Sequence, residues 1–524
     1  MTSLLAHAGA IDALTEEQRI AAAASTRNVF IEAGPGTGKT TVSAQRVGVQ
    51  RFAPAHRFDH RAVVAVSFTR AATKNLRQWV QRLWGPRALA WPHRIVTLDT
   101  VMADLLHDLL RSGLLWWPNA SSLWPDGNIA LDVRDSWASC GGTVWTKSIY
   151  KLSLTAGQIE IRQGFAAERA NRVPAVAVVP HLRSGICTHE DVRDSLGQAL
   201  GYPALAERIQ QRLGATVRAL VVDEVFDAND LDIAIIEAAL RSGVDVTLVG
   251  DPWQALYLFR GARPQVVPEL LEREKIRTLR LTQSFRWRSE EQRRLATDLR
   301  NGSPVVLPTG TPDNLDVVLG LWWKELWEIG GGVLPLAFHS FKGGYEEAAA
   351  TLLLNHVTRS IFELDATYLN DSLTALNIQD RDVLRQLEPA FQEVVDTLRP
   401  GGKEATTAAY VKLVEVVKGV SERELRRPHH DHTKRLGLLQ QRLAFTGRPV
   451  PGLTTHQAKG GEWEAVGVRL RDSEREALAG GLSSAEDTHR KLYVACTRAH
   501  QITVEVPPAP AAAPKTRSRR RRPS

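Results

Sequence analysis

A glycine-rich turn at residues 33–40, AGPGTGKT, constrains the fold of this chain more than any other stretch. An apolar run at 29–31 precedes it, and the pattern at 42–49 predicts a helix after it. The glycines let the backbone turn sharply, so that successive N–H groups and the positive end of the helix point at one anion. This order of strand, loop and helix predicts a phosphate cradle.

The side chains of the turn predict what the cradle holds. Lys39 would reach the β- and γ-phosphates of a nucleotide, and Thr40 would hold Mg²⁺. The strict P-loop pattern has a glycine where Ala33 stands, so this turn is a close variant of it. A chance glycine-rich turn is the alternative, but the flanking strand and helix favour the cradle. The residues predicted to surround the nucleotide here are Gly34, Pro35, Gly36, Thr37, Gly38, Lys39 and Thr40.

An apolar run at 218–222 ends in two adjacent carboxylates, Asp223 and Glu224. Beside a phosphate cradle, Asp223 would bind Mg²⁺ through water, and Glu224 would accept a proton from the water that attacks the γ-phosphate. An isolated Asp-Glu pair is often only part of a turn. The cradle upstream makes nucleotide hydrolysis the favoured interpretation.

Further apolar runs at 62–68, 94–100 and 244–251 alternate with predicted helices. This alternation predicts an α/β fold with a parallel sheet whose carboxyl edge binds ligands. Phe68 and Thr69 fall at that edge.

Residues 252–262 follow the last of these runs and contain a polar amide, two aromatic rings and an arginine. The pattern suits a segment that connects a nucleotide site to a bound strand whose bases stack on the rings. Ordinary packing is the alternative for Tyr257 and Phe259. Residues 279–286 then begin a second set of alternating elements.

Near the amino terminus, residues 14–18 open a predicted helix with Thr15 as the N-cap, Gln18 at the third helical position and an apolar face at 20–24. A capping box explains Gln18 structurally. The same amide could also read the edge of an adenine, and neither interpretation excludes the other.

The composition is that of a globular protein without a disulfide framework. A length of 524 residues and a hydrophobic content of 43% suit about three or four domains with proper cores. The cysteines, Cys140, Cys187 and Cys496, are far apart and odd in number, which fits a reducing compartment. Residues 1–10 lack a leader pattern, and no apolar run is long enough to cross a bilayer. We expect a soluble, cytoplasmic, nucleoid-associated protein with no membrane partner.

Most of the net charge of +8 comes from the last stretch, 515–522, which follows a proline- and alanine-rich linker at 507–514. We expect a disordered basic tail there. It is either solvated and inert, or it binds phosphates by releasing counterions.

Taken in order, these segments resemble the motifs of superfamily 1A helicases of the UvrD/Rep type. The matching segments are 14–18 for the Q motif, 33–40 for motif I, 67–76 for Ia, 222–229 for II, 248–262 for III, 281–289 for IV, 452–463 for V and 490–499 for VI.

The resemblance implies two RecA-like P-loop domains, with parallel sheets flanked by helices, and inserted, mainly helical subdomains. The implied boundaries are 1–110 and 186–278 for the first domain, 111–185 for a tryptophan-rich insertion, 279–378 and 449–506 for the second domain, 379–448 for a reduced second insertion, and 507–524 for the linker and tail.

The resemblance also implies roles for residues that spacing alone does not assign. Arg286 and Arg498 match contacts to the γ-phosphate, and Gln254 matches its sensor. Phe285 resembles the ring that stacks on adenine, and Glu462 the carboxylate that reaches the ribose. The residues implied to lie along single-stranded DNA are Phe68, Thr69, Tyr257, Phe259, Arg260 and His456.

Three positions depart from the family pattern. Motif II has Phe226 in place of glutamine, which removes a polar link between the ATP and DNA sites. Asp99 stands where motif Ib carries histidine, and an acid there would repel a phosphate. Motif V has Gly461 in place of leucine.

The resemblance implies an ATP-dependent 3′–5′ translocase and helicase in DNA repair, recombination, replication or phage defence. Its cofactors would be ATP and Mg²⁺, and its substrates single-stranded DNA and junctions of single- with double-stranded DNA. We expect a monomer, with room for a protein partner such as a nuclease or a repair or replication factor. The alternatives are an RNA-directed superfamily 1 motor and a weakly hydrolysing ATP switch within a nucleic-acid-processing complex.

Overall fold

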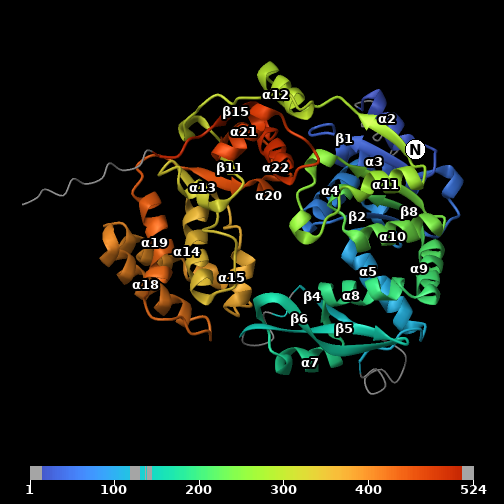
Figure 1. Cartoon of the computed structure of the whole chain (residues 1–524), viewed down its shortest axis with the longest axis horizontal. Coiled ribbons are helices and arrows are strands. Elements are labelled where there is room, and N and C mark those ends of the chain that lie inside the picture. Colours follow the sequence, from blue (N-terminus) through green and yellow to red (C-terminus); the bar gives the residue numbers. More distant parts are fainter. Residues whose placement is uncertain (1–13, 119–129, 136, 138–143, 510–524) are drawn as a thin grey trace, which may run out of the picture. The chain divides into compact units, whose positions relative to one another are not determined.

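A computed structural model describes residues 14–118, 130–135, 137 and 144–509. The chain divides into two compact units, each with its own parallel sheet (Figure 1). The first unit comprises Met1–Ser303 and Gly481–Thr497, and the second comprises Pro304–Gly480 and Arg498–Ser524. Several parts of the sequence analysis concern residues outside this description. They are the basic tail at 515–522, most of its linker, the start of the chain at 1–10, and Cys140.

The sheet of the first unit has six parallel strands in the order β10-β1-β9-β8-β2-β3. The strands are β1 (Val29–Ala33), β2 (Ala62–Ser67), β3 (Arg94–Thr97), β8 (Val217–Val222), β9 (Asp245–Gly250) and β10 (Arg277–Leu281). The helices of this unit that matter below are α2 (Glu16–Ala23), α3 (Lys39–Phe52), α4 (Arg70–Trp84), α5 (Leu98–Arg111), α8 (His189–Leu200), α9 (Pro203–Thr216), α10 (Asp230–Arg241), α11 (Val266–Arg273), α12 (Glu290–Arg300) and α22 (Asp487–Cys496). The predicted α/β class with a parallel sheet is confirmed.

Strand β2 shows why its sequence is apolar without alternation. Val63 and Ala65 pack into one cluster with α3 and α4, whereas Val64 and Val66 pack into another with α5 and α10. Because successive side chains point to opposite faces, a strand covered on both faces must be apolar throughout.

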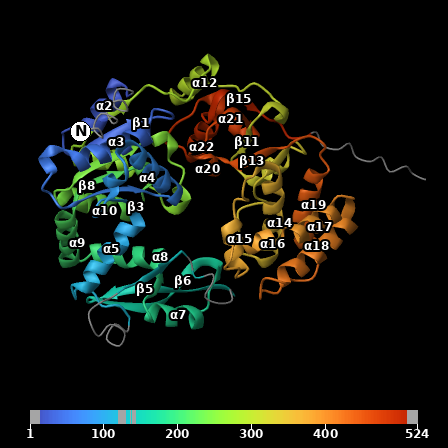
Figure 2. The ribbon, with the colours of Figure 1, turned by 180° about the vertical axis from the view of Figure 1, so that it is seen from behind.

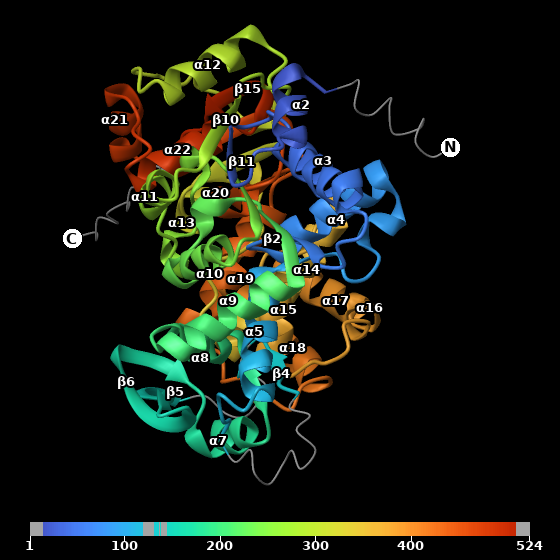
Figure 3. The same cartoon turned by 90° about the vertical axis from the view of Figure 1, so that its right-hand side faces the viewer.

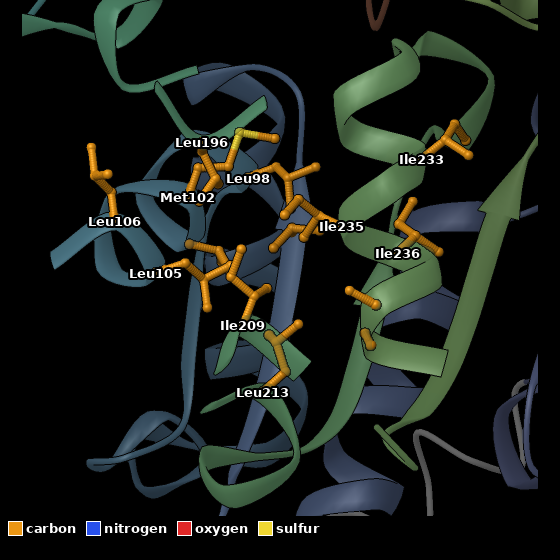
Figure 4. Close-up of a cluster of buried hydrophobic side chains, with 14 of the residues drawn as sticks. Leu98, Met102, Leu105, Leu106, Leu196, Ile209, Leu213, Ile233, Ile235 and Ile236 are labelled. Atoms are coloured by element: carbon orange, nitrogen blue, oxygen red, sulfur yellow. The ribbon is translucent and has the colours of Figure 1, made fainter. Parts of the chain in front are cut away.

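The larger cluster joins four helices to the sheet (Figure 4). Leucines and a methionine of α5 meet Leu196 of α8, Ile209 and Leu213 of α9, and isoleucines of α10. The side chains labelled in Figure 4 are at most 4% exposed. The cluster fixes the chain on both sides of Asp223 and Glu224, which follow β8.

The first insertion is built around a long hairpin, so the expectation that it is mainly helical is wrong for this region. Strands β5 (Val144–Thr155) and β6 (Gln158–Arg172) pair antiparallel, and β4 (Asp132–Arg134) pairs with β7 (Ile186–Thr188) beside α7 (Ala175–Arg183) (Figure 3). The turn uses Ala156 and Gly157, both with positive φ. Alternating polar and apolar residues at 151–155 give this hairpin one face to bury, a strand pattern that the scattered tryptophans obscured.

The second unit has five parallel strands in the order β12-β13-β11-β14-β15. They are β11 (Val317–Gly320), β12 (Val333–Pro335), β13 (Val450–Thr454), β14 (Trp463–Arg469) and β15 (Ala499–Glu505). Its short helices next to the sheet are α13 (Trp323–Trp327), α20 (Thr455–Ala458) and α21 (Asp472–Gly480).

The insertion of the second unit is helical, as expected (Figure 2). Its core is continuous with the long helix α14 (Tyr345–Phe362) and includes Phe391, Tyr410 and Leu436. Its helices are α15 (Leu369–Ala375), α16 (Val383–Gln386), α17 (Glu388–Leu398), α18 (Gly402–Lys418) and α19 (His430–Leu443).

The expected boundary between the RecA-like domains at 279 falls inside β10. This strand pairs with β1, from Val29 with Arg277 to Ala33 with Leu281, and the compact unit extends to Ser303. Hydrogen bonding to β1 places the strand in the first sheet, although its sequence begins motif IV. No helix in the described part of the chain combines the length and apolar character needed to span a bilayer.

Candidate nucleotide and nucleic-acid site

The predicted cradle follows β1 directly and ends where α3 begins, at Lys39. Gly36 and Gly38 have φ of 70° and 83°, conformations that favour glycine. A Cβ on Gly36 would lie 2.4 Å from the Cβ of Arg286, and one on Gly38 would lie 2.6 Å from Nε2 of Gln18. Both glycines are therefore required by conformation and by space.

Two segments hold the cradle in shape. The Ser284 hydroxyl donates to the Pro35 carbonyl at 2.8 Å, and the Phe285 N–H donates to the Gly36 carbonyl at 2.9 Å. The Gln18 amide donates to the Thr37 carbonyl at 2.9 Å.

The same Gln18 side chain accepts from the Thr15 N–H at 3.0 Å, so the predicted capping box is confirmed. Its oxygen and one of its N–H groups are thus used within the chain, which ties α2 to the cradle. The predicted apolar face at 20–24 needs correction, because Ile20 is 51% exposed and Ala21 and Ala22 make the buried contact.

The side chains of Lys39 and Glu224 form an ion pair at the cradle. Lys39 Nζ lies 3.1 Å from Glu224 Oε1, and the two side chains are 12% and 20% exposed. Asp223 is buried, and its N–H donates to the Val66 carbonyl at 2.9 Å, which continues the pairing of β8 with β2. Glu224 itself has φ of 59°, where the chain turns away from the strand. The carboxyl edge of the sheet thus collects the ammonium group and both carboxylates.

Gln254 reaches this region from the end of β9. It is 4% exposed, and its amide donates to Asp251 at 2.7 Å. Asp251, which is fully buried, also accepts from the Trp253 N–H at 3.2 Å. The buried carboxylate therefore fixes the orientation of the predicted γ-phosphate sensor.

Arg300, at the end of α12, is a residue that the sequence analysis missed. Its guanidinium donates to Asp251 at 3.1 Å and to the Tyr493 hydroxyl at 3.3 Å, and it lies 3.5 Å from Glu32. Burial lowers the pKa of this arginine, but Asp251 and Tyr493 outweigh burial and the net pKa is raised. The available signal was Glu32, a charge in the middle of an apolar strand, because such a residue needs a partner.

Arg286 lies against the cradle within the first unit. It is 8% exposed and donates to the Thr497 carbonyl at 3.0 Å, beyond the end of α22. Gln292 similarly donates to the Cys496 carbonyl at 2.8 Å, and Arg490 donates to the Ala255 carbonyl at 3.0 Å. Motifs III, IV and VI are therefore joined by side-chain to backbone bonds. Phe285, whose ring is predicted to stack on adenine, is 55% exposed.

The predicted DNA contacts of motif III form one cluster. The rings of Tyr257 and Phe259 are 5.9 Å apart, and the Arg260 guanidinium lies 5.2 Å from the first ring and 5.5 Å from the second. Phe259 is 68% exposed. Phe68 and Thr69 follow β2 at the same edge of the sheet, where Thr69 caps α4 by accepting from the Ala72 N–H at 3.1 Å.

The remaining predicted residues belong to the second unit. Arg498 precedes β15 and is 1% exposed, and its carbonyl accepts from the Trp463 N–H at 3.2 Å. Glu462 is exposed, with Oε2 3.2 Å from Nε2 of His500. His456 lies on α20 at the carboxyl end of β13.

Two of the departures from the family pattern have structural explanations. Phe226 is 4% exposed and packs edge-on against Phe30, with 5.9 Å between the rings. Asp99 pairs with Arg193 at 2.6 Å, and Arg193 pairs in turn with Asp232 at 3.1 Å. The carboxylate of Asp99 is therefore paired inside the chain with a guanidinium that it shares with Asp232, so the expected repulsion of a phosphate is reduced.

The donor set at the cradle fits a magnesium nucleotide. Thr40, in the first turn of α3, and Asp223 supply oxygen atoms of the kind Mg²⁺ prefers. Among the described residues no group of three or more His, Cys, Asp or Glu side chains could hold a metal. Mg²⁺ bound here would therefore need phosphate oxygens and water for its other ligands, as in nucleotide sites.

Comparisons with known proteins agree with this arrangement. Residues 16–260 match the protein family described as an AAA domain. The chain is 27% identical over 574 aligned positions to ATP-dependent DNA helicase UvrD2 of Mycobacterium tuberculosis, covering 93% of this chain and 78% of that protein. It is 24% identical over 312 positions to DNA helicase II of Escherichia coli, covering 53% and 39%. The ordered motifs, the parallel sheets and these similarities together support a UvrD/Rep-like superfamily 1 helicase.

Proposed function

We propose that this helicase is an ATP-driven motor that moves 3′ to 5′ along single-stranded DNA and unwinds duplex DNA at junctions, within repair, recombination, replication or phage defence. One juxtaposition carries the proposal. Gln254, beside the cradle, and the Tyr257–Phe259–Arg260 cluster belong to one short segment after β9. A change at the γ-phosphate can therefore reach rings that are placed to stack on bases.

The proposed chemistry is attack of water on the γ-phosphate. Lys39 binds phosphate oxygens, and Glu224 accepts one proton of the water as its oxygen bonds to phosphorus. The bond from phosphorus to the β–γ bridging oxygen breaks, and ADP leaves with that electron pair. Mg²⁺ held with Thr40 and Asp223 would neutralise negative charge on the phosphates.

The pairing of Lys39 with Glu224 gives this site a specific order of events. While the ammonium group pairs with Glu224 at 3.1 Å, that carboxylate is occupied by Lys39. A γ-phosphate that draws Lys39 away would release Glu224 to accept a proton. Arg286 lies beside Gly36 and is placed to stabilise charge on the transferred group.

Other roles rest on the family resemblance. We propose Arg498 for a γ-phosphate contact, Glu462 for the ribose, Phe285 for adenine, and His456, Phe68 and Thr69 for the DNA strand. Stacking of bases on aromatic rings requires no particular sequence, which suits a motor that must pass over any strand.

The test is ATP turnover with and without single-stranded DNA at one salt concentration, for the natural chain and for Lys39→Ala. We expect DNA to stimulate turnover in the natural chain only. Competition with RNA tests the nucleic acid, and displacement from substrates with a 3′ or a 5′ tail tests polarity. Turnover that is insensitive to DNA, or equal in both proteins, would contradict the proposal.

A further inference from the structure

Charge is distributed very unevenly within the first unit. Between Glu32 and Asp99 the sequence contains a single acidic residue, Asp59, among many lysines and arginines. Asp59 is itself paired with Arg61 at 2.8 Å, and this hydrogen bond lowers its pKa to about 2. The segment from the cradle to the start of α5 is therefore strongly basic, although Lys39, Arg46, Arg70 and Arg94 pair with carboxylates from outside it.

Much of this charge lies on the outer face of α4. Lys74, Arg77 and Arg82 are exposed there, whereas Leu76 and Val80 are fully buried against the sheet. No acidic residue occurs on this helix. A solvated face of an ordinary helix usually mixes both signs, so a purely basic face favours an anionic partner.

Aromatic rings are interleaved with the arginines at the end of α3 and in the loop that follows. The Arg51 guanidinium lies 5.2 Å from the Phe52 ring, Arg57 lies 4.4 Å from the Phe58 ring, and Arg82 lies 5.6 Å from the Trp79 ring. Phe52 also stacks on Trp84 at 5.7 Å. Phe58 is 75% exposed, so a large apolar ring lies in solvent beside a cation.

A hollow of about 830 Å³ lies at the amino-terminal ends of β2, β3 and β8, opposite the edge that carries the cradle. Trp91 lines it and is 93% exposed. Arg61, Arg94, Arg111 and Arg212 line it as well. Its two carboxylates are already paired, Asp104 with Arg94 at 2.5 Å and Asp108 with Arg208 at 2.7 Å.

We propose that this aromatic–arginine surface, formed by Arg51, Phe52, Arg57, Phe58, Arg82 and Trp91, is a second binding surface for single-stranded nucleic acid, separate from the strand path at the carboxyl edge. Exposed rings next to cations suit a partner with stacking bases and phosphates. An acidic protein would use the charges but would leave the exposed rings without an equivalent ligand. The inference goes beyond the proposed motor and does not depend on ATP turnover.

The test uses the full chain carrying Lys39→Ala, so that no strand is moved during the measurement. Binding of oligo(dT) is compared for a strand of about 10 nucleotides, which fills one site, and for one several times longer. Replacing both Arg57 and Arg82 with Gln should weaken binding of the long strand and leave the short strand unchanged. The slope of log affinity against log salt should fall by about 0.7 for each phosphate that the variant surface no longer neutralises.

A second variant, Phe58→Ala with Trp91→Ala, tests stacking. It should lower the affinity for the long strand about tenfold or more. Photocrosslinking with 4-thiothymidine should mark the peptides that contain Phe58 and Trp91. The control for charge is Arg241→Gln with Arg273→Gln, which removes two positive charges from α10 and α11. The control for stacking is Trp322→Ala, which removes an exposed ring that also lies next to an arginine. Neither control should change binding of the long strand.

Equal affinity and equal salt slope in natural and variant chains, with no crosslink at this surface, would overturn the proposal. So would competition by poly-glutamate at this surface without any effect of oligo(dT), which would assign it to an acidic protein. DNA-stimulated ATP turnover is measured separately in chains with Lys39 intact. A failure of the motor proposal is therefore distinguishable from a failure of this one.

Discussion

The two sheets are built on the same plan but carry different chemistry at their carboxyl edges. In the first unit, β1 leads into the phosphate cradle, β8 into Asp223 and Glu224, and β9 into Asp251. In the second unit, β11 leads into a short bend before α13, and β13 leads directly into α20, whose Thr455 hydroxyl donates to the Gly320 carbonyl at 3.4 Å. Parallel strands alone therefore do not make a nucleotide site.

The difference lies in which residues follow the strands. The first sheet gathers charged side chains that need an anion or a metal ion, whereas the second edge satisfies its polar groups locally. A fold supplies positions, and the residues at those positions supply function. If this contrast is correct, substitutions of the charged residues at the first edge should stop chemistry, whereas substitution of Glu462 in the second unit should adjust nucleotide affinity.

The largest effect is expected for Glu224→Gln. The amide keeps the shape of the side chain but cannot accept the proton, so turnover should fall by about 10²–10⁴-fold. ATP binding should persist, because Lys39 and the cradle are unchanged. Turnover is measured by phosphate release, and binding by a fluorescent ATP analogue. Turnover close to that of the natural chain would remove Glu224 from the role of base.

Arg300→Met should lower kcat by roughly 10-fold or more while KM changes little, because Asp251 would no longer hold Gln254 in place. Arg300 is a positioning residue, so Arg300→Lys, which retains the charge, should restore part of kcat. Loss of this partner of the buried Asp251, which keeps the Trp253 and Gln254 donors, should also cost about 1–3 kcal/mol of stability. The double variant Arg300→Met with Asp251→Asn is the control for folding. A change confined to stability, with kcat intact in all folded variants, would refute the positioning role.

The second unit offers a matched pair of carboxylates. Glu462 and Glu464 each lie 3.2 Å from a ring nitrogen of His500, but only Glu462 is proposed to reach the ribose. Glu462→Gln should raise KM for ATP about 5–10-fold, as expected for one charged hydrogen bond, whereas Glu464→Gln should not. Equal changes in both variants would indicate that the effect passes through His500.

The smallest effect on turnover is expected at the amino ends of the first sheet, where the predicted change is in stability. Burial, followed by the nearby Arg51 and Arg218, lowers the pKa of His93 from 6.5 to about 4. Between these values the unfolded chain binds more protons than the folded one, so stability should fall as pH drops from about 6.5 to 4, by at most about 1.4 kcal/mol per pH unit. His93 Nδ1 accepts from the Val63 N–H at 2.9 Å, and Gln can also accept there. Urea unfolding at several pH values should show a shallower pH dependence in His93→Gln.

The sequence by itself determined the parallel α/β class, the cradle at 33–40, the carboxylates after β8 and the capping box of α2. Each of these depends on neighbours along the chain, through strand periodicity, glycine conformation or a bond across three residues. Local patterns therefore carry them.

The tertiary structure alone decided the pairing of β10 with β1, the hydrogen bond of Arg300 with Asp251 and the ion pair of Asp99 with Arg193. Arg300 lies 49 residues from Asp251 along the chain, and Arg193 lies 94 residues from Asp99. The packing of helices and strands decides which charged residues pair and which strand completes a sheet. No local sequence pattern records a contact between segments that are distant along the chain.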